Sequence, residues 1–259
     1  MKIESLHIYP IKSAEGFEVD SIQVEKIGFK NDRFFAICDA NHKIITAREF
    51  PKLLGLQTII KGDALYITFN NNSKFVSLTK ELSIIELSLF KKSAFGKLVD
   101  TDVDIWLSNQ LGFECKLVRI ALDNLRETNS HQIAFSDEYP IHLIAKETID
   151  VLSKLSDIEN NVTRFRPNIV VSGINAFEED KIDKLTIGNC EFTVVSNAQR
   201  CSLITINPDT YEKDKNQEPL RTLAKEFGKN SKAELGVYLV PVKTGVIHKN
   251  DDLILKLKI

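Results

Sequence analysis

One cysteine in this sequence directly follows an arginine, in the triplet Gln199-Arg200-Cys201. A cation beside a thiol favours the thiolate, because an opposite charge stabilises the ionised form. A thiolate is both a nucleophile and a soft metal ligand. A lone cysteine between two β-rich runs is, on the other hand, commonly buried for packing. The triplet therefore indicates either a reactive, metal-binding thiol or a structural one, and the local sequence leaves both open.

Cationic residues also stand near the ends of expected strands. Lys12 and Ser13 follow the first strand in the segment YPIKS, Arg33 follows Asp32 before an apolar run, and Arg48 stands at a turn. A loop lysine beside a hydroxyl can hold a phosphate. The alternative for each of these cations is a solvated side chain or a structural ion pair.

A second pair of arginines stands in the segment RFRPN, where Arg164 and Arg166 precede Asn168 and an apolar run at 169–171. An arginine at the mouth of a strand, followed by a proline that fixes the chain direction, suits a rigid bidentate contact with an anion. A structural salt bridge is an equal alternative for either arginine.

Other familiar sites are excluded by the motifs that the sequence lacks. It has four cysteines, at positions 38, 115, 190 and 201, but no CxxC pair, and its five histidines are dispersed. A zinc knuckle, an iron–sulfur domain and a disulfide framework therefore have no ligand or bridging set. GxSxG, HExxH, GxGxxG and GxxxxGKS are absent as well, which removes the hydrolase, zincin, dinucleotide and P-loop interpretations.

Strands are the elements that must position these residues. Short runs rich in β-branched or aromatic residues and bounded by turn residues predict strands at Lys2–Tyr9, Arg33–Cys38, Ala64–Phe69, Cys115–Ile120, Pro167–Val171, Cys190–Val195, Ser202–Ile206, Leu235–Val240 and Asp252–Ile259. The last run alternates leucine or isoleucine with lysine, which predicts one buried face. Helical spacing of apolar residues predicts helices over Asp102–Leu111, Lys146–Leu155 and Pro219–Phe227. The expected fold is mainly β with a few helices (α+β), a barrel or sandwich rather than a doubly wound sheet.

The composition is that of an ordinary globular protein. The chain has 259 residues and a net charge of −2, with 27% charged and 43% hydrophobic residues. A near-neutral balance argues against nucleic acid or an acidic membrane as the main partner. Neither a signal peptide nor a membrane-spanning run is present, so we expect a cytoplasmic protein.

The polar stretch at 122–140 predicts a boundary between a domain at 1–125 and a domain at 126–259.

Several segments, in order, resemble one family. YPIKS, GFKNDRFF, ITAREFPKL, RFRPNIVVSG, IGNCEFTVVSNAQRCSLITINPDT, EPLRTLAKE and LGVY are similar to the ordered motifs of MOSC proteins with an N-terminal β-barrel domain, a group that includes the mitochondrial amidoxime-reducing component and its bacterial relatives. This resemblance covers nearly the whole chain. It implies a β-barrel MOSC domain preceded by a smaller β-barrel-like domain.

The resemblance also implies a molybdenum cofactor, a pyranopterin dithiolene with a terminal phosphate. Cys201 matches the cysteine that ligates molybdenum in the family, and it is the expected metal ligand and a catalytic residue. Asp137 matches an acidic residue of the family and is the second expected catalytic residue. The positions expected to bind the cofactor are Lys12, Ser13, Arg33, Arg48, Arg166, Asn168, Gln199, Arg200 and Tyr238. Binding of pyridoxal phosphate is a further association that the resemblance brings.

By the same resemblance the protein reduces small N-hydroxylated or N-oxygenated compounds. The ferredoxin-like domain of some bacterial relatives is missing, so electrons are expected from a separate ferredoxin-, flavin- or haem-type protein. The chain departs from the family at Gln199, often serine, at Ala198, where a second cysteine is common, and at Tyr211, usually glycine. Two alternatives remain, a sulfur carrier with a persulfide on Cys201 and a protein that binds or transfers the cofactor.

Overall fold

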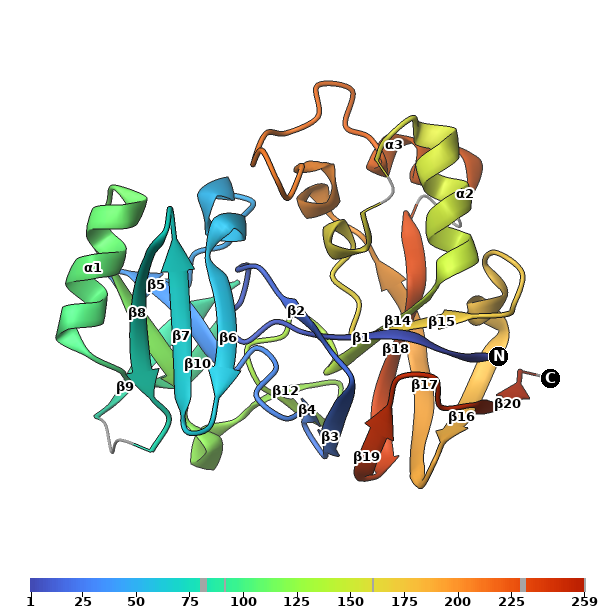
Figure 1. Cartoon of the computed structure of the whole chain (residues 1–259), viewed down its shortest axis with the longest axis horizontal. Coiled ribbons are helices and arrows are strands. Elements are labelled where there is room, and N and C mark those ends of the chain that lie inside the picture. Colours follow the sequence, from blue (N-terminus) through green and yellow to red (C-terminus); the bar gives the residue numbers. More distant parts are fainter. Residues whose placement is uncertain (80–82, 91, 160, 229–231, 259) are drawn as a thin grey trace. The chain divides into compact units, whose positions relative to one another are not determined.

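The computed structural model describes residues 1–79, 83–90, 92–159, 161–228 and 232–258. In these ranges strands dominate and α-helices number three (Figure 1), which confirms the prediction of a mainly β protein with a few helices. Contacts between residues divide the chain into two compact units. Unit 1 comprises residues 1–8, 18–30 and 139–259, and unit 2 comprises residues 9–17 and 31–138. The division into continuous domains at 125/126 stays a prediction, since these units group the chain by contact.

Unit 1 is organised around an eight-stranded sheet with the order β2-β1-β15-β14-β18-β17-β16-β20. Its strands are β1 (Lys2–Ile8), β2 (Phe17–Val19), β14 (Ile141–Ala145), β15 (Ile169–Ser172), β16 (Ile182–Ile187), β17 (Cys190–Gln199), β18 (Glu234–Lys243) and β20 (Leu253–Leu257). A three-stranded sheet joins β19 (Gly245–His248), β3 (Ser21–Glu25) and β4 (Gly28–Phe29).

The position of strand β15 in the sheet explains why polar and apolar residues do not alternate in the run at 169–171. It pairs with β1 in the antiparallel sense and with β14 in the parallel sense, so it is an interior strand. Ile169, Val170 and Val171 are all at most 1% exposed. A strand covered on both faces is uniformly apolar, as this one is.

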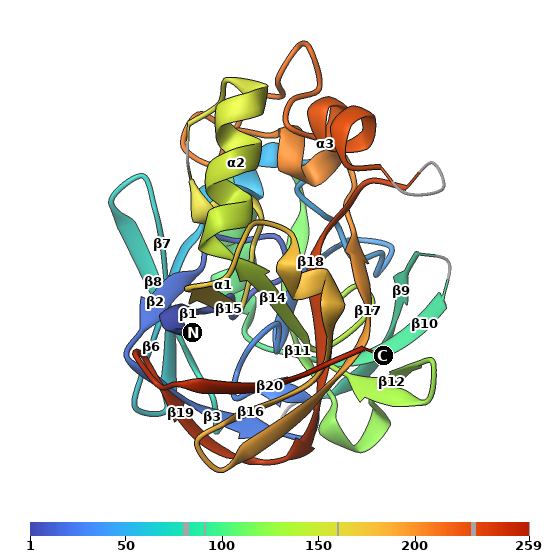
Figure 2. The ribbon, with the colours of Figure 1, turned by 90° about the vertical axis from the view of Figure 1, so that its right-hand side faces the viewer.

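Two helices pack beside this part of the sheet, α2 (Lys146–Ser156) and α3 (Leu220–Glu226), which lie near each other in Figure 2. Ile149 and Leu152 of α2 share a buried cluster with Leu223 of α3 and with Ile144 and Leu235 of the sheet. The apolar spacing that predicted the helices is thus their packing face.

Unit 2 contains two larger sheets, a hairpin and one α-helix. The strands are β5 (Phe35–Asp39), β6 (Gln57–Lys61), β7 (Ala64–Phe69), β8 (Asn72–Ser77), β9 (Ile84–Leu89), β10 (Lys92–Leu98), β11 (Cys115–Ile120), β12 (Arg126–Thr128) and β13 (His131–Ile133). They form the sheets β5-β11-β10-β9 and β6-β7-β8 and the hairpin β12-β13. The polar stretch at 122–140, where a domain boundary was predicted, therefore contains this hairpin. Its two strands have three residues each, which is too few to show an alternation of polar and apolar residues.

The helix of unit 2, α1 (Thr101–Leu111), has clear local end signals. The side chain of Asp100 accepts a hydrogen bond from Asp102 N at 2.9 Å, and Gly112 closes the helix in the left-handed region at φ 85°. The helix is fixed to β11 because Leu117 N donates to Asp104 Oδ1 at 2.8 Å.

Two expectations about strands need correction. The segment Ser202–Ile206, predicted as a strand, is a 3₁₀-helix over Ser202–Thr205, because its N–H groups bond locally, from Ile204 N to Cys201 O and from Ile206 N to Leu203 O. Strand β20 is present, but its face is only partly buried, with Leu253 9% and Leu257 52% exposed. Residue 259 of that predicted strand lies outside the described residues.

Candidate functional site

Cys201 follows the end of β17 and immediately precedes the 3₁₀-helix. It is partly exposed, whereas the other three cysteines are buried. Burial raises the pKa of Cys38 to about 12 and that of Cys115 to about 11, and it also raises the pKa of Cys190. These three thiols stay protonated near neutral pH, and Cys201 is the one of the four cysteines that is not buried.

Arg200 connects the cysteine to the RFRPN segment. Its backbone N donates to Ala233 O at 2.8 Å, and its Nη2 donates to Phe165 O at 2.7 Å. Its Nε is buried and has no hydrogen-bond partner among the described residues. The neighbouring Gln199 is exposed and pairs with Glu234 across β17 and β18. Arg200 thus positions the chain before Cys201 and still carries a buried donor.

Arg164 holds the chain on the other side of Cys201, a role that the sequence did not reveal. Its Nη1 donates to Ile204 O at 3.3 Å and to Ile206 O at 3.2 Å, and the residue is 7% exposed. Burial lowers the pKa of its guanidinium. The two carbonyls lie about 40 positions away in sequence, so no local motif connects them to Arg164.

Arg166 and Asn168 are both buried, at 8% and 1% exposure. Arg166 has the left-handed backbone angle φ 54°, which is uncommon for a residue other than glycine and is found in functional loops. The Asn168 amide bridges two strands, since its Oδ1 accepts from His142 N and its Nδ2 donates to His7 O, both at 3.2 Å. Asn168 therefore helps to hold β1 and β14 together at the start of β15.

Tyr238 lies on β18 in an aromatic group of unit 1. Its ring centroid is 5.5 Å from that of Tyr139 and 5.8 Å from that of His142. The His142 ring contacts Leu235 O through Nε2 at 3.0 Å. Gly236, two residues before the tyrosine, has φ 72°, and a Cβ there would lie 2.4 Å from Leu143 O. Only glycine fits this approach of β18 to β14.

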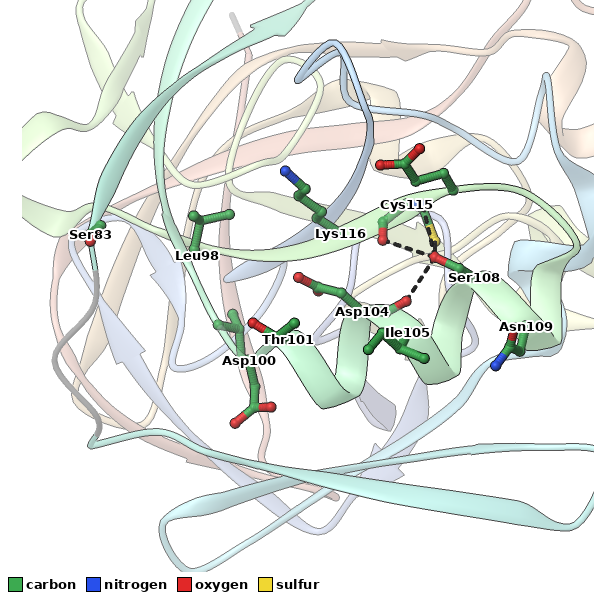
Figure 3. A pocket seen from close by; sticks show the side chains of 12 residues that line it. Ser83, Leu98, Asp100, Thr101, Asp104, Ile105, Ser108, Asn109, Cys115 and Lys116 are labelled. Carbon is green, nitrogen blue, oxygen red and sulfur yellow. Dashed lines mark hydrogen bonds between the residues drawn. The ribbon is translucent and has the colours of Figure 1, made fainter.

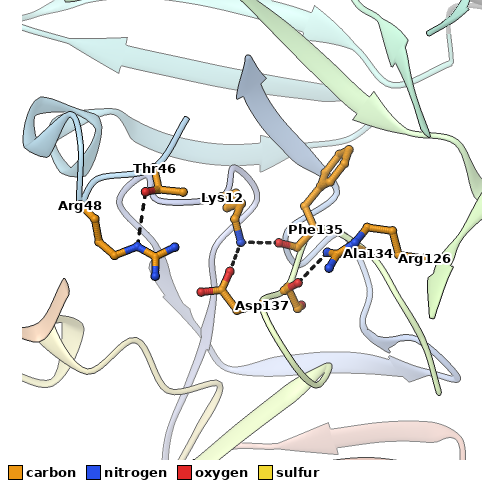
Figure 4. A network of polar contacts seen from close by, with 8 residues as sticks. Lys12, Thr46, Arg48, Arg126, Ala134, Phe135 and Asp137 are labelled. Carbon is orange, nitrogen blue, oxygen red and sulfur yellow. Dashed lines mark hydrogen bonds and ion pairs between the residues drawn. The ribbon is translucent and has the colours of Figure 1, made fainter. Parts of the chain in front are cut away.

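In unit 2 the predicted residues Lys12, Asp137, Arg33 and Arg48 form a charged group (Figure 4 shows all but Arg33). Lys12 is 6% exposed; its Nζ donates to Phe135 O at 2.7 Å and forms an ion pair with Asp137. Burial lowers the pKa of Lys12, and the carboxylate opposes that shift only in part.

The carboxyl group of Asp137 is ionised near neutral pH. Burial works to raise its pKa, but the positive charges of Lys12, Arg48 and Arg33 outweigh that effect, and the pKa lies below its usual value. The side chain is 43% exposed, so solvent reaches the carboxylate. Asp137 is thus a carboxylate held among cations and open on one side.

Arg33 and Arg48 each rest on an aromatic ring. The Arg33 guanidinium pairs with Asp32 and lies 4.5 Å from the centroid of Tyr9. That of Arg48 lies 4.8 Å from the centroid of Phe90. Both contacts are within the range of cation–π attraction.

The backbone of two predicted residues in unit 2 is also unusual. Ser13 has φ 67° and Arg33 has φ 52°, both in the left-handed region. With Arg166 in unit 1, three predicted site residues adopt this conformation, which clusters at binding sites in other proteins.

Arg126, which the sequence did not single out, completes this group. Its Nη1 donates to Ser136 O at 2.9 Å and contacts Ala134 O at 3.5 Å (Figure 4). Together with Lys12 it binds three successive carbonyls, 134 to 136, and so orients the chain just before Asp137. Arg126 lies in the hairpin strand β12, in the polar stretch where the sequence showed no periodicity.

A separate pocket of unit 2, of about 670 Å³, lies beside α1 (Figure 3). Ser108 Oγ donates to Asp104 O at 2.8 Å and accepts from Cys115 N at 3.0 Å. Burial raises the pKa of Asp104. These polar groups fix α1 to β11, and we assign them a structural role.

The described residues fit the two chemical demands of the molybdenum cofactor. A terminal phosphate needs cations, which unit 2 carries in Lys12, Arg33 and Arg48 and unit 1 carries in Arg166. A soft metal needs a thiolate, and Cys201 of unit 1 is the cysteine that is not buried. The buried Nε of Arg200 is a donor without an acceptor in the described part of the chain. No group of three or more His, Cys, Asp and Glu side chains among the described residues is arranged to hold a metal ion.

Two family models match the sequence. The MOSC N-terminal beta barrel domain matches residues 1–114, and the MOSC domain matches residues 130–254. None of the helices in the described ranges is long and apolar enough to cross a membrane.

The curated relatives agree with these models. Mitochondrial amidoxime reducing component 2 of Rattus norvegicus is 30% identical over 240 residues, 85% of this chain and 71% of its own. The protein of the same name from Bos taurus is 29% identical over 238 residues, 85% of this chain and 70% of its own. Molybdenum cofactor sulfurase of Caenorhabditis elegans is 33% identical over 246 residues, which is 92% of this chain but 33% of the sulfurase.

The matches thus extend over both halves of the sequence, including the segments that carry Lys12 and Cys201. This protein belongs to the MOSC family, with an N-terminal MOSC β-barrel domain followed by a MOSC domain.

Proposed function

We propose that this protein binds the molybdenum cofactor and reduces N-hydroxylated or N-oxygenated compounds. The observation that carries the proposal is the contrast among its thiols, in which Cys201 is accessible and the other three are buried. Support comes from relatives named amidoxime reducing components, at about 30% identity. The proposal places the protein in the cytoplasm, as the sequence predicts.

In this proposal Cys201 ligates the metal, and the other predicted residues bind the cofactor or position its ligands. When bound, the cofactor supplies the two-electron redox couple of the reaction. The overall reaction breaks the N–O bond, consumes two electrons and two protons and releases water. Electrons come from a separate ferredoxin-, flavin- or haem-type protein.

The structure suggests distinct parts for the residues around these groups. Arg200 and Arg164 fix the chain on the two sides of Cys201 through backbone carbonyls. Asp137 is proposed as the catalytic carboxylate. Because its pKa is lowered, it is ionised near neutral pH and is suited to hold the Lys12 ammonium.

The test is the molybdenum content of the full chain expressed in a host that makes the cofactor. We expect Cys201→Ala to lose most of its molybdenum. Cys115→Ala, which changes a buried thiol in unit 2, is the matched control and should keep it. Reduction of benzamidoxime with an artificial electron donor should fall in parallel. Equal molybdenum content in Cys201→Ala and wild type would refute the assignment of the ligand.

A sulfur carrier is the second candidate, favoured by the 33% identity to a molybdenum cofactor sulfurase. Here Cys201 holds a persulfide and passes its sulfur to a metal centre of a partner. Sulfur released from Cys201 by cyanide, without bound molybdenum, would support this function. Stoichiometric molybdenum without any reductase activity would instead indicate a protein that binds or transfers the cofactor.

A further inference from the structure

The guanidinium of Arg164 is a buried charge without a counter-ion among the described residues. The residue is 7% exposed, and its guanidinium donates from Nη1 to the carbonyls of Ile204 and Ile206, which are neutral acceptors. Its Nε is buried and has no hydrogen-bond partner in the described ranges, and no acidic side chain there forms an ion pair with it. Buried charges are normally paired. The two carbonyls thus explain the position of Arg164 but leave its charge uncompensated.

Arg164 lies in the wall of a pocket of about 430 Å³ in unit 1, a volume within the range of small-molecule sites. Thr205 is a second buried polar residue of this wall, and the loop at 207–216 supplies most of the remaining lining. The loop folds back on the chain before it, since Asp214 N donates to Thr205 O at 2.8 Å. None of the residues expected to bind the cofactor is among the described residues of the lining, so the pocket is separate from that site.

The charges that line the pocket are balanced. Three are cations and three are acids: Arg164, Lys213, Lys215, Glu159, Glu212 and Asp214. Glu159 is exposed, and it attracts Arg164 without forming an ion pair with it or with any other described residue. The Asp214 carboxylate, in contrast, is engaged by two backbone N–H groups of the same loop. An arginine and a glutamate held apart in this way fit a ligand that carries both charges, whereas the three acids disfavour a multiply charged anion.

We propose that this pocket binds an α-amino acid with a polar side chain, in its zwitterionic form. The carboxylate binds to Arg164 and provides the missing counter-ion, and the ammonium group binds to Glu159. Asn207 and Thr210, which also line the pocket, favour a polar side chain over an apolar one. The site goes beyond the proposed function, because it involves neither the cofactor nor Cys201.

The test is calorimetry on the full chain without cofactor, with three probes. These are L-glutamine, L-glutaminamide, which lacks the carboxylate, and N-acetyl-L-glutamine, which lacks the ammonium group. We expect L-glutaminamide to bind about tenfold more weakly than L-glutamine, because it loses a charged partner of a buried guanidinium. N-acetyl-L-glutamine should bind about threefold more weakly, a smaller loss because Glu159 is exposed.

Variants place the probe in the pocket. Glu159→Gln should weaken L-glutamine about threefold and leave N-acetyl-L-glutamine unchanged. Glu191→Gln, at an exposed glutamate of β17 outside the pocket, is the matched control and should change neither affinity. Arg164→Lys should weaken both probes about tenfold. Because Arg164 also holds the segment after Cys201, the circular dichroism spectrum of this variant is compared with that of wild type, and Glu159→Gln decides if the two spectra differ.

The molybdenum assignment is separated from this proposal by Cys201→Ala, which should bind L-glutamine as wild type does. Three results would overturn the proposal: no binding of L-glutamine to wild type, equal affinities of wild type for L-glutamine and L-glutaminamide, or an affinity for L-glutamine that is unchanged in Glu159→Gln.

Discussion

Replacement of Asn168 by alanine removes a side chain that joins two strands of unit 1. Its amide accepts from His142 N and donates to His7 O, and the residue is 1% exposed. A buried backbone group that loses its partner costs about 1–3 kcal/mol. Since two such groups are affected, we expect Asn168→Ala to lower the free energy of unfolding by about 2–6 kcal/mol.

Aspartate at the same position gives a sharper test. Asn168→Asp keeps the acceptor for His142 N but places a carboxylate oxygen against His7 O. A buried aspartate has a raised pKa, so the folded state takes up the proton more readily than the unfolded state, and once protonated the side chain can again donate. The stability of this variant relative to wild type should therefore rise as the pH falls from 7 to 5.

Urea unfolding of the cofactor-free full chain, followed by circular dichroism, measures both effects without involving ligand binding. The single tryptophan, Trp106, lies in α1, so its fluorescence reports separately on unit 2. Asn216→Ala, in an exposed loop of unit 1, is the matched control and should change stability by no more than about 0.5 kcal/mol. An unfolding midpoint of Asn168→Ala equal to that of wild type would show that the amide does not join the strands as described.

Three further predictions concern other parts of the chain. Gly236→Ala should lower the free energy of unfolding by about 2 kcal/mol or more, because the added Cβ would clash with Leu143 O. The melting temperature should therefore fall by several degrees, and an unchanged melting temperature would contradict this. Burial raises the pKa of Glu179, so the stability of wild type relative to Glu179→Gln should rise as the pH falls from 7 to 5, measured by urea unfolding. Lys12→Met should raise the pKa of Asp137 in a carbon-13 NMR titration, and an unchanged titration would show that Lys12 is not what lowers it.

The helices were predictable because their signals are local. The predicted Asp102–Leu111 differs by one residue from α1 (Thr101–Leu111), and Lys146–Leu155 by one from α2 (Lys146–Ser156). Capping residues and apolar spacing act within a few residues of the helix that they define. The same holds for β7 and β11, whose predicted limits coincide with the observed ones.

The strand predicted over Ser202–Ile206 was wrong because contacts distant in sequence decide that segment. Its β-branched residues favour a strand, but the Arg164 guanidinium binds the carbonyls of Ile204 and Ile206, and Ile204 is fully buried in the cluster with α2 and α3. Tertiary packing overrides β propensity here. Arg126 escaped notice for a related reason, since the carbonyls that it binds lie 8 and 10 residues away.

By itself, the sequence determined which residue types are available, where most strands and helices lie, and that a cysteine follows an arginine within an ordered set of motifs. Only the tertiary structure decided which thiol is accessible, because Cys190 and Cys201 both border the same strand, and packing buries the first and leaves the second partly exposed. It likewise decided that the Asn168 amide joins two strands and that the Arg48 guanidinium lies over the ring of Phe90. The exposure of a side chain and the charges around it depend on neighbours from distant segments, and those neighbours come close only once the chain has folded.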